Sequence, residues 1–186
     1  MIQSISLTHV IETASVNKLK ESRKYEAASM RKRIMTKTES PDVRNDIDWL
    51  HLDQIASIEV TSEDSSYPVE NALLLNTEAG WRAASGGEQT LRVIFDTPQR
   101  LKRIQLLFIE DKIERFQEFV LRWSPDDGKT FRDIVRQQWN FNPTGAAQET
   151  ENYQVELEGV TQLELEIVPD KSGGHAYASL EQLRLA

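Results

Sequence analysis

The sequence contains no cysteine, and its three histidines, His9, His51 and His175, are far apart. Without cysteine there are no disulfide bonds and no thiolate-ligated zinc or iron–sulfur sites. The histidines lack partners at the spacing of a zinc site. Residues 1–9 are interrupted by polar side chains, unlike a signal peptide. Together these absences predict a cytoplasmic protein.

Long apolar runs and an excess of basic residues are also missing. No stretch approaches the roughly 20 apolar residues that a membrane-spanning helix requires, so no membrane span is predicted. The formal net charge of −8 argues against nucleic acid as a partner, because phosphate binding needs clustered Lys and Arg. Residues 1–40 nevertheless carry eight Lys/Arg against four Asp/Glu, so their net charge of +4 contrasts with the acidic remainder.

Residues 1–48 are therefore interpreted as a basic N-terminal arm, a helical or irregular extension of the main domain. Residues 10–37 contain neither Gly nor Pro and are rich in good helix formers. Two roles remain open for this arm. It is either a solvated extension, or it lies on an acidic patch of its own domain or of a neighbouring protein.

From about Ile55 the sequence alternates between apolar and polar residues, a period typical of half-buried antiparallel strands. Turn signals such as Thr97-Pro98, Pro125–Gly128 and Glu158-Gly159 separate most of these segments. About eight strands without intervening amphipathic helices predict an all-β fold, an antiparallel β-sandwich of jelly-roll type. The strands are expected around the apolar positions Ile58–Val60, Leu91–Phe95, Ile104–Phe108, Phe119–Trp123, Val155–Leu157, Leu163–Ile167 and Leu183–Leu185.

Several short segments occur in a characteristic order. A loop at Pro68–Ala72 precedes Trp81, the strand Gln89–Asp96 precedes Pro98, and the chain closes with Ala178–Leu185. This order resembles the coagulation factor 5/8 type C, or discoidin, domain of the galactose-binding-like superfamily. The resemblance implies a discoidin-like sandwich over residues 49–186. It also implies binding of sugars, phospholipid head groups or proteins through loops at one end.

The resemblance raises the question of calcium. The family's loop usually carries Asp-Gly and helps to hold a calcium ion, whereas this chain has Ala72–Thr77, without an acidic residue. The family's C-terminal glutamate is present as Glu181, at a core-facing position. A buried carboxylate needs a cation or hydrogen-bond donors. Either calcium ligated by Glu181 or an arginine such as Arg82 or Arg103 satisfies that need, and the missing Asp favours the arginine and no cofactor.

The most prominent candidate ligand site lies near Trp139, Asn140 and Phe141, where strand alternation is expected to end and a loop to begin. An exposed aromatic platform beside amide or guanidinium donors suits a sugar ligand. Arg82 and His175 are the other predicted ligand-binding residues, His175 because it follows two glycines in a loop. The alternative is that Trp139 and Phe141 cap the open end of the core or contact the N-terminal arm.

These observations favour a non-catalytic binding module, of a kind found in bacteria, rather than an enzyme. The sequence contains no phosphate-binding Gly-rich loop, nucleophile elbow or metalloprotease helix. Carbohydrate is the leading ligand class. The alternative is a protein-interaction or assembly module that uses the basic arm and the loop aromatics. The oligomeric state is left open.

Overall fold

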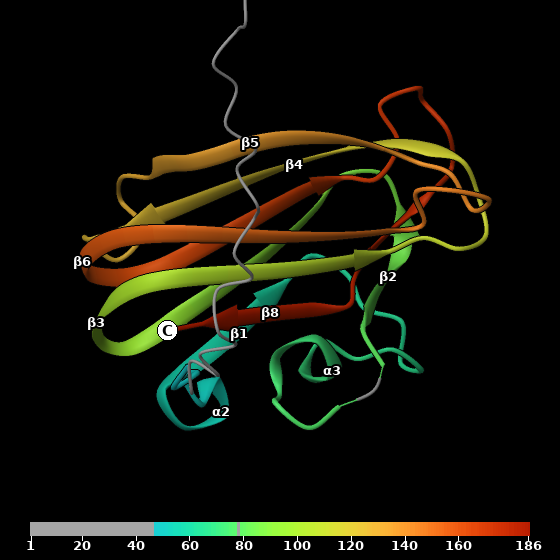
Figure 1. The fold of residues 1–186 in the computed structure, drawn as a ribbon. Coiled ribbons are helices and arrows are strands. Elements are labelled where there is room, and N and C mark those ends of the chain that lie inside the picture. The colour runs from blue at the N-terminus through green and yellow to red at the C-terminus, as the bar shows by residue number, and fades with distance from the viewer. Residues whose placement is uncertain (1–46, 78) are drawn as a thin grey trace, which may run out of the picture. The chain divides into compact units, whose positions relative to one another are not determined.

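The computed structural model describes residues 47–77 and 79–186, and Figure 1 shows their fold. The basic arm predicted for residues 1–48 therefore lies outside the described residues except for its last two. Among the described residues, none of the helices has the length and apolar character needed to cross a bilayer.

The described chain consists mainly of antiparallel strands, as predicted, with two short helices that the sequence analysis did not anticipate. The helices are α2 (Leu52–Ile55) and α3 (Glu70–Leu73). The strands are β1 (Ala56–Val60), β2 (Trp81–Gly86), β3 (Gln89–Ile109), β4 (Arg115–Ser124), β5 (Arg132–Phe141), β6 (Gln148–Val168), β7 (Tyr177–Leu180) and β8 (Gln182–Leu185).

Two long strands, β3 and β6, form the frame of the sandwich. They pair with each other from Gln89 opposite Ile167 to Ile109 opposite Gln148. Their register shifts between Ile94 and Arg103, where both strands bend over and pass from one layer to the other (Figure 1). The turns predicted at Thr97-Pro98 and Glu158-Gly159 are wrong, because they are bends within continuous strands. Gly159 adopts a φ of 70°, which a residue with a side chain rarely adopts.

The bend divides the strands into the two layers of a sandwich. In the first layer the order is β1-β3-β6-β4-β5. In the second layer β8 pairs with the other half of β3, over Ile104–Leu107, and β2 forms a separate pair with β7. This arrangement confirms the predicted antiparallel β-sandwich.

The core lies between the layers because alternate residues of the facing strands point inward. Phe108 of β3 and Phe119 of β4 stack across the sandwich with ring centroids 5.2 Å apart. Trp81 is buried, whereas Trp123 packs against the core and remains partly exposed. Burial of such aromatic and aliphatic surface supplies most of the driving force for folding.

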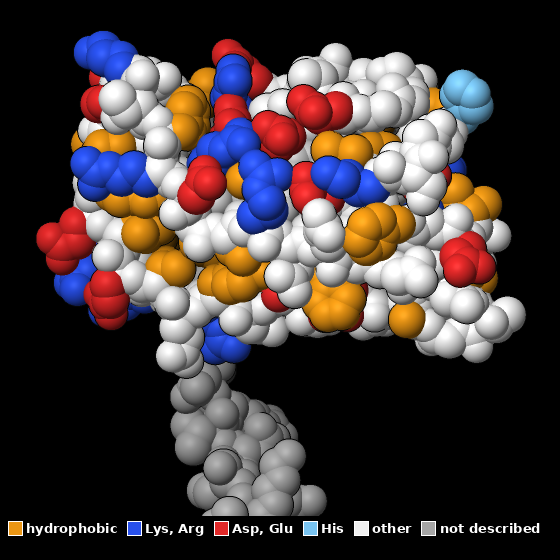
Figure 2. Space-filling model, turned by 90° about the horizontal axis from the view of Figure 1, so that it is seen from above, with side chains coloured by type: hydrophobic (Ala, Val, Ile, Leu, Met, Phe, Trp, Pro, Cys, Tyr) orange, Lys and Arg blue, Asp and Glu red, His pale blue; other side chains and the backbone are white. Residues whose placement is uncertain are grey.

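The outer face of the first layer carries a row of alternating charges, one from each strand. Glu59, Arg92, Glu164, Arg122 and Asp133 lie directly opposite one another in the strand register. Arg92 Nε lies 2.7 Å from Glu164 Oε2, and Arg122 Nη1 lies 3.1 Å from Glu164 Oε1. Acidic and basic side chains also lie side by side over the face of the molecule seen in Figure 2. Opposite charges at directly paired positions stabilise the strand register.

The central acid of this row is predicted to matter most. The Glu164 side chain is 8% exposed and is shared by two arginines, whereas Glu59 at the edge is 63% exposed. Glu164→Gln leaves two cationic neighbours without their common partner, so we expect a loss of about 1–3 kcal/mol in the free energy of urea unfolding. Glu59→Gln, the matched control, is expected to cost less than about 1 kcal/mol. Equal losses of unfolding free energy for the two variants would contradict a stabilising role of this row of charges.

Candidate functional site

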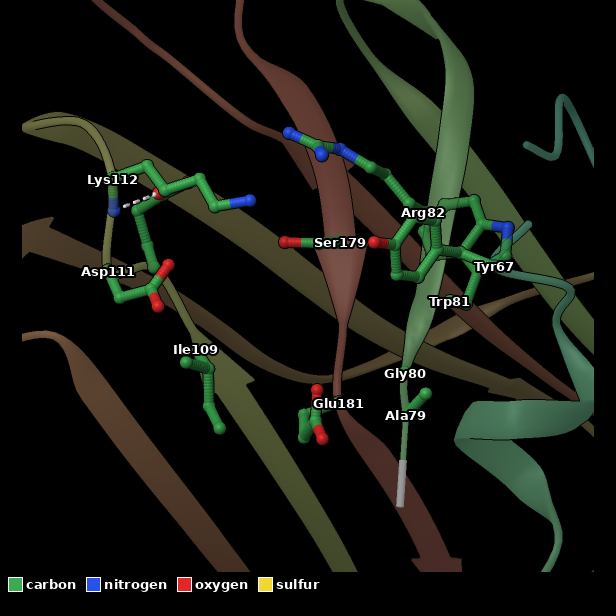
Figure 3. Close-up of a pocket in the computed structure, with 11 residues that line it drawn as sticks. Tyr67, Ala79, Gly80, Trp81, Arg82, Ile109, Asp111, Lys112, Ser179 and Glu181 are labelled. Carbon is green, nitrogen blue, oxygen red and sulfur yellow. Dashed lines mark hydrogen bonds between the residues drawn. The ribbon is translucent and has the colours of Figure 1, made fainter. Parts of the chain in front are cut away.

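One end of the sandwich contains an open pocket of about 320 Å³. Its walls come from the start of β2, from β7, from the loop between β3 and β4, and from the segment that precedes α3 (Figure 3). The lining residues are Tyr67, Ala79, Gly80, Trp81, Arg82, Ile109, Glu110, Asp111, Lys112, Ser179 and Glu181.

The strand β2 reaches the pocket through a close backbone contact at Gly80. A Cβ atom at this position would lie 2.5 Å from the Leu180 carbonyl oxygen and 2.8 Å from Glu181 Oε2, so only glycine fits. Strand alternation then buries Trp81 in the core and turns Arg82 to the opposite, outer side. The Arg82 backbone is held by hydrogen bonds to the loop ahead of α3, since its N–H donates to Tyr67 O and its carbonyl accepts from Asp64 N–H.

Two exposed tyrosines, Tyr67 and Tyr177, lie close to Arg82. The Arg82 guanidinium carbon lies 5.8 Å from the centroid of the Tyr177 ring, a cation–π contact. Tyr67 lines the pocket. Tyr67 and Tyr177 are 40% and 44% exposed, so their rings remain available to a ligand.

The opposite wall of the pocket is the loop between β3 and β4, which is held in place by the carboxylate of Glu110, a residue of the same loop. Glu110 Oε1 accepts hydrogen bonds from the backbone N–H groups of Lys112 (3.0 Å) and Ile113 (3.1 Å). This arrangement places the Lys112 and Asp111 side chains at the pocket (Figure 3). Lys112 thereby adds a second cationic donor across from Arg82.

A buried arginine, Arg115, ties the elements below the pocket together. Its Nη1 donates to Tyr177 O (2.7 Å) and its Nη2 to Ser179 Oγ (3.1 Å). Its Nε lies 3.2 Å from Glu110 Oε2, an ion pair without hydrogen-bond geometry, and its guanidinium lies 5.7 Å from the Phe141 ring centroid. Burial lowers the pKa of the Arg115 guanidinium, with a further contribution from the charge of Arg82.

Glu181 lies in the pocket wall beneath Gly80. Burial raises the pKa of its carboxyl group above the ordinary value. The expected arginine partner was wrong, since among the described residues neither Arg82 nor Arg103 lies within ion-pair distance of Glu181. Arg103 instead donates to Asn152 Oδ1 at 3.2 Å.

The burial of the Glu181 carboxyl group predicts that this residue destabilises the folded protein in a pH-dependent way. A carboxyl whose folded pKa lies above its unfolded value of 4.5 stabilises the fold at low pH and loses that contribution as the pH rises through the folded pKa. Glu181→Gln should therefore melt at a higher temperature than the wild type at pH 7, in EDTA, and the difference should shrink towards pH 4. Glu88→Gln, at an exposed position, is the control. A Glu181→Gln variant that melts lower at pH 7 would contradict this account.

The predicted aromatic loop at residues 139–141 is wrong, because strand β5 continues through Phe141. Phe141 is 1% exposed and belongs to the core, so it offers no exposed platform. Trp139 is half-buried, and its Nε1–H donates to Glu151 Oε1 at 2.9 Å. Asn140 is exposed on the outer face. The structure therefore favours the alternative in which Trp139 and Phe141 cover this part of the core.

The structure places Arg82 on β2 and His175 in the loop that precedes β7, whereas Trp139 lies on β5. His175 is exposed, and its carbonyl oxygen lies 3.5 Å from the position of a Cβ on Gly86, at the far end of β2 from Arg82. Sequence reasoning missed Tyr67, Tyr177 and Arg115. Arg115 has a usable signal, since it shares the inward parity of Phe119 and Leu121 and so requires a buried partner.

The described residues thus form a two-layered antiparallel sandwich of the galactose-binding-like fold, with a polar and aromatic pocket at one end. The F5/8 type C domain model matches residues 57–183, which is more than half of the chain. The chain belongs to the F5/8 type C domain family. No curated protein sequence matches it.

Solved structures with this fold include several carbohydrate-binding modules. The family 32 module of Clostridium perfringens NanJ, in complex with galactose, has 13% identity and a TM-score of 0.53, covering 74% of this chain and 96% of that one. A module from a family 31 glycoside hydrolase of the same organism has 17% identity and a TM-score of 0.57, covering 74% and 93%. A pectin-binding module has 16% identity and a TM-score of 0.53, covering 71% and 90%.

Proposed function

We propose that this protein is a non-catalytic carbohydrate-binding module whose ligand sits in the Arg82 pocket, the site formed by Tyr67, Arg82, Lys112 and Tyr177. The observation that carries the proposal is that Arg82 and the exposed Tyr67 line a pocket of about 320 Å³, while the Arg82 guanidinium also contacts the exposed ring of Tyr177 beside it. Aromatic rings pack against the C–H face of a pyranose, while guanidinium and ammonium groups donate hydrogen bonds to its hydroxyls.

The size and rigidity of the pocket support a small sugar as ligand. Its volume lies at the lower end of the roughly 300–1,000 Å³ range of ligand sites, which suits one or two sugar rings. Arg115 and Glu110 hold β7 and the β3–β4 loop through buried contacts, so little ordering is left for the ligand to impose. Galactose and GalNAc, each present in the structure of a similar module, are the first sugars to test.

The pocket contains both cationic donors and carboxyl groups, and structural contacts engage one of these carboxylates, Glu110. Glycosidases use a pair of carboxyl groups that flank the scissile bond, one of which acts as an acid. Here Glu110 is engaged by Arg115 and by two backbone N–H groups, which occupies its oxygens. Asp111 and Glu181 also line the pocket, beside the donors Arg82 and Lys112, and these four side chains can accept hydrogen bonds from sugar hydroxyls or donate hydrogen bonds to them.

Isothermal titration calorimetry of the full chain with galactose and GalNAc tests the site. Arg82→Ala is expected to weaken binding by roughly 10- to 150-fold, because a hydrogen bond to a charged group contributes about 1.5–3 kcal/mol. Arg132→Ala is the matched control, since Arg132 also lies over an aromatic ring, 5.2 Å from Trp123, but on the first half of β5. It should leave the affinity unchanged.

Two results would contradict the proposal that a sugar binds at the Arg82 pocket. Equal affinity in the wild type and Arg82→Ala, with a loss in Trp139→Phe, would move the ligand to β5 and restore the sequence-based site. A wild-type chain that binds neither these two sugars nor any other on a glycan array would exclude carbohydrate as the ligand.

A protein-binding role is the second candidate, and one observation favours it. Large apolar side chains that are exposed gather at or beside the pocket end, with exposures between 37% and 47%. They are Tyr67, Ile109, Ile113, Phe116 and Tyr177. Exposed apolar groups concentrated in one region mark an interaction surface. Light scattering of the full chain at increasing concentration tests a second copy as partner, and Ile113→Lys should abolish any association through this surface while leaving sugar binding intact.

A further inference from the structure

The loop that follows α3 is held by a buried arginine of the last strand. Arg184 of β8 is 6% exposed, although its neighbours Leu183 and Leu185 belong to the core. Its Nη1 donates to the carbonyl oxygen of Ala72 at 2.7 Å, and its Nη2 donates to that of Leu74 at 2.8 Å. One planar guanidinium thus spans two carbonyl groups of the segment that follows Asn71.

The arginine satisfies polar groups that this segment would otherwise leave unpaired. The last carbonyl groups of a helix have no partner within the helix and attract cations. The Thr77 hydroxyl also lies at this loop, in hydrogen-bond reach of the Asn71 and Leu74 carbonyl oxygens. Burial lowers the pKa of Arg184, and within the described residues its guanidinium donates hydrogen bonds to backbone carbonyl oxygens, those of Ala72, Leu183 and Leu74.

A calcium ion fits these residues poorly. Calcium requires six to eight oxygen ligands at about 2.3–2.6 Å, normally including carboxylates. The residues from Ala72 to Thr77 supply no carboxylate, and Glu181, the acid that the family resemblance implies, lies in the pocket wall against Gly80. Within the described part of the chain, no group of three or more His, Asp or Glu side chains is placed to hold a metal ion.

Arg184 and a metal ion would also compete for the same oxygens. An ion bound to the Ala72 or Leu74 carbonyl would lie within about 5 Å of the guanidinium, because each partner is less than 3 Å from the shared oxygen. Two positive charges at that distance repel each other in a buried site. The loop can therefore bind either a metal ion or the Arg184 guanidinium, and this chain supplies the guanidinium itself.

We propose that Arg184 replaces the calcium ion of the family in this protein: its guanidinium binds the carbonyl groups of the loop after α3 and makes the fold independent of metal. Because the Arg184 guanidinium is covalently attached to β8, it cannot dissociate from the protein as a bound metal ion can. The loop that leads to Gly80 and the Arg82 pocket is fixed as soon as β8 docks, whatever the calcium concentration. The inference concerns the loop and does not rest on sugar binding.

Thermal unfolding of the full chain in 5 mM calcium chloride and in EDTA tests the proposal without any sugar. A metal site filled at a hundredfold excess over its Kd would raise the melting temperature by roughly 5–10 °C. We expect the two melting temperatures to agree within about 1 °C, and calorimetric titration of the chain with calcium to show no binding at these concentrations. A rise of several degrees in calcium would overturn the proposal.

Variants of Arg184 test whether its guanidinium stabilises the loop after α3. Arg184→Met keeps the apolar stem but leaves two carbonyl groups unpaired, so we expect a melting temperature lower by roughly 5–10 °C. Arg184→Lys keeps the charge but has one nitrogen for two carbonyl groups, and should fall between Arg184→Met and the wild type. If Arg184→Met fails to fold, Arg184→Lys carries the comparison.

The control is Arg100→Met, which removes an arginine whose side chain is 55% exposed and pairs with Glu156. It should change the melting temperature by less than about 2 °C. Hydrogen exchange adds a local readout, since Arg184→Lys should speed exchange of the amides of residues 71–77 more than those of β4. Melting temperatures for Arg184→Met or Arg184→Lys equal to that of Arg100→Met would overturn the role of Arg184.

Discussion

The pairing of β3 with β6 along their whole lengths is the constraint on which the rest of this structure depends. Each strand contributes 21 residues and passes through the bend into both layers. The other strands of the main sheet then add to these two, β1 and β8 to β3, and β4 to β6. The register between β3 and β6 therefore decides which side chains enter the core and where the two layers meet.

Three buried local contacts convert this frame into a shaped pocket. Gly80 allows β2 to start directly against Glu181, Arg115 binds β7 and the β3–β4 loop, and Arg184 holds the turn after α3. All three act through backbone approach or backbone carbonyl groups. Arg82 and the tyrosines beside it are thereby positioned before any ligand arrives, which is the condition for binding with little entropic loss.

The fold was largely predictable because the alternation of residues such as Leu91, Val93 and Phe95 is a local signal that the sandwich requires. The site was less predictable. Pro98 and Gly159 mark turns in most contexts, and only the long-range register makes them bends. Strand β5 ran two residues further than Trp139 because β4 supplies partners up to Arg115. The partners of Arg115 and Arg184 lie far away in sequence, at Ser179 and Ala72, so no local pattern identifies them.

We propose that the ligand binds at the Arg82 pocket, at the end of the sandwich held by these buried contacts. Amide chemical-shift mapping of the isotope-labelled full chain during titration with galactose or GalNAc tests that claim most directly. The account predicts shifts concentrated at Tyr67, Arg82, Lys112 and Tyr177, with the outer face of the first layer unchanged. Shifts centred on Gln137–Asn140 of β5, or none at saturating sugar, would contradict it.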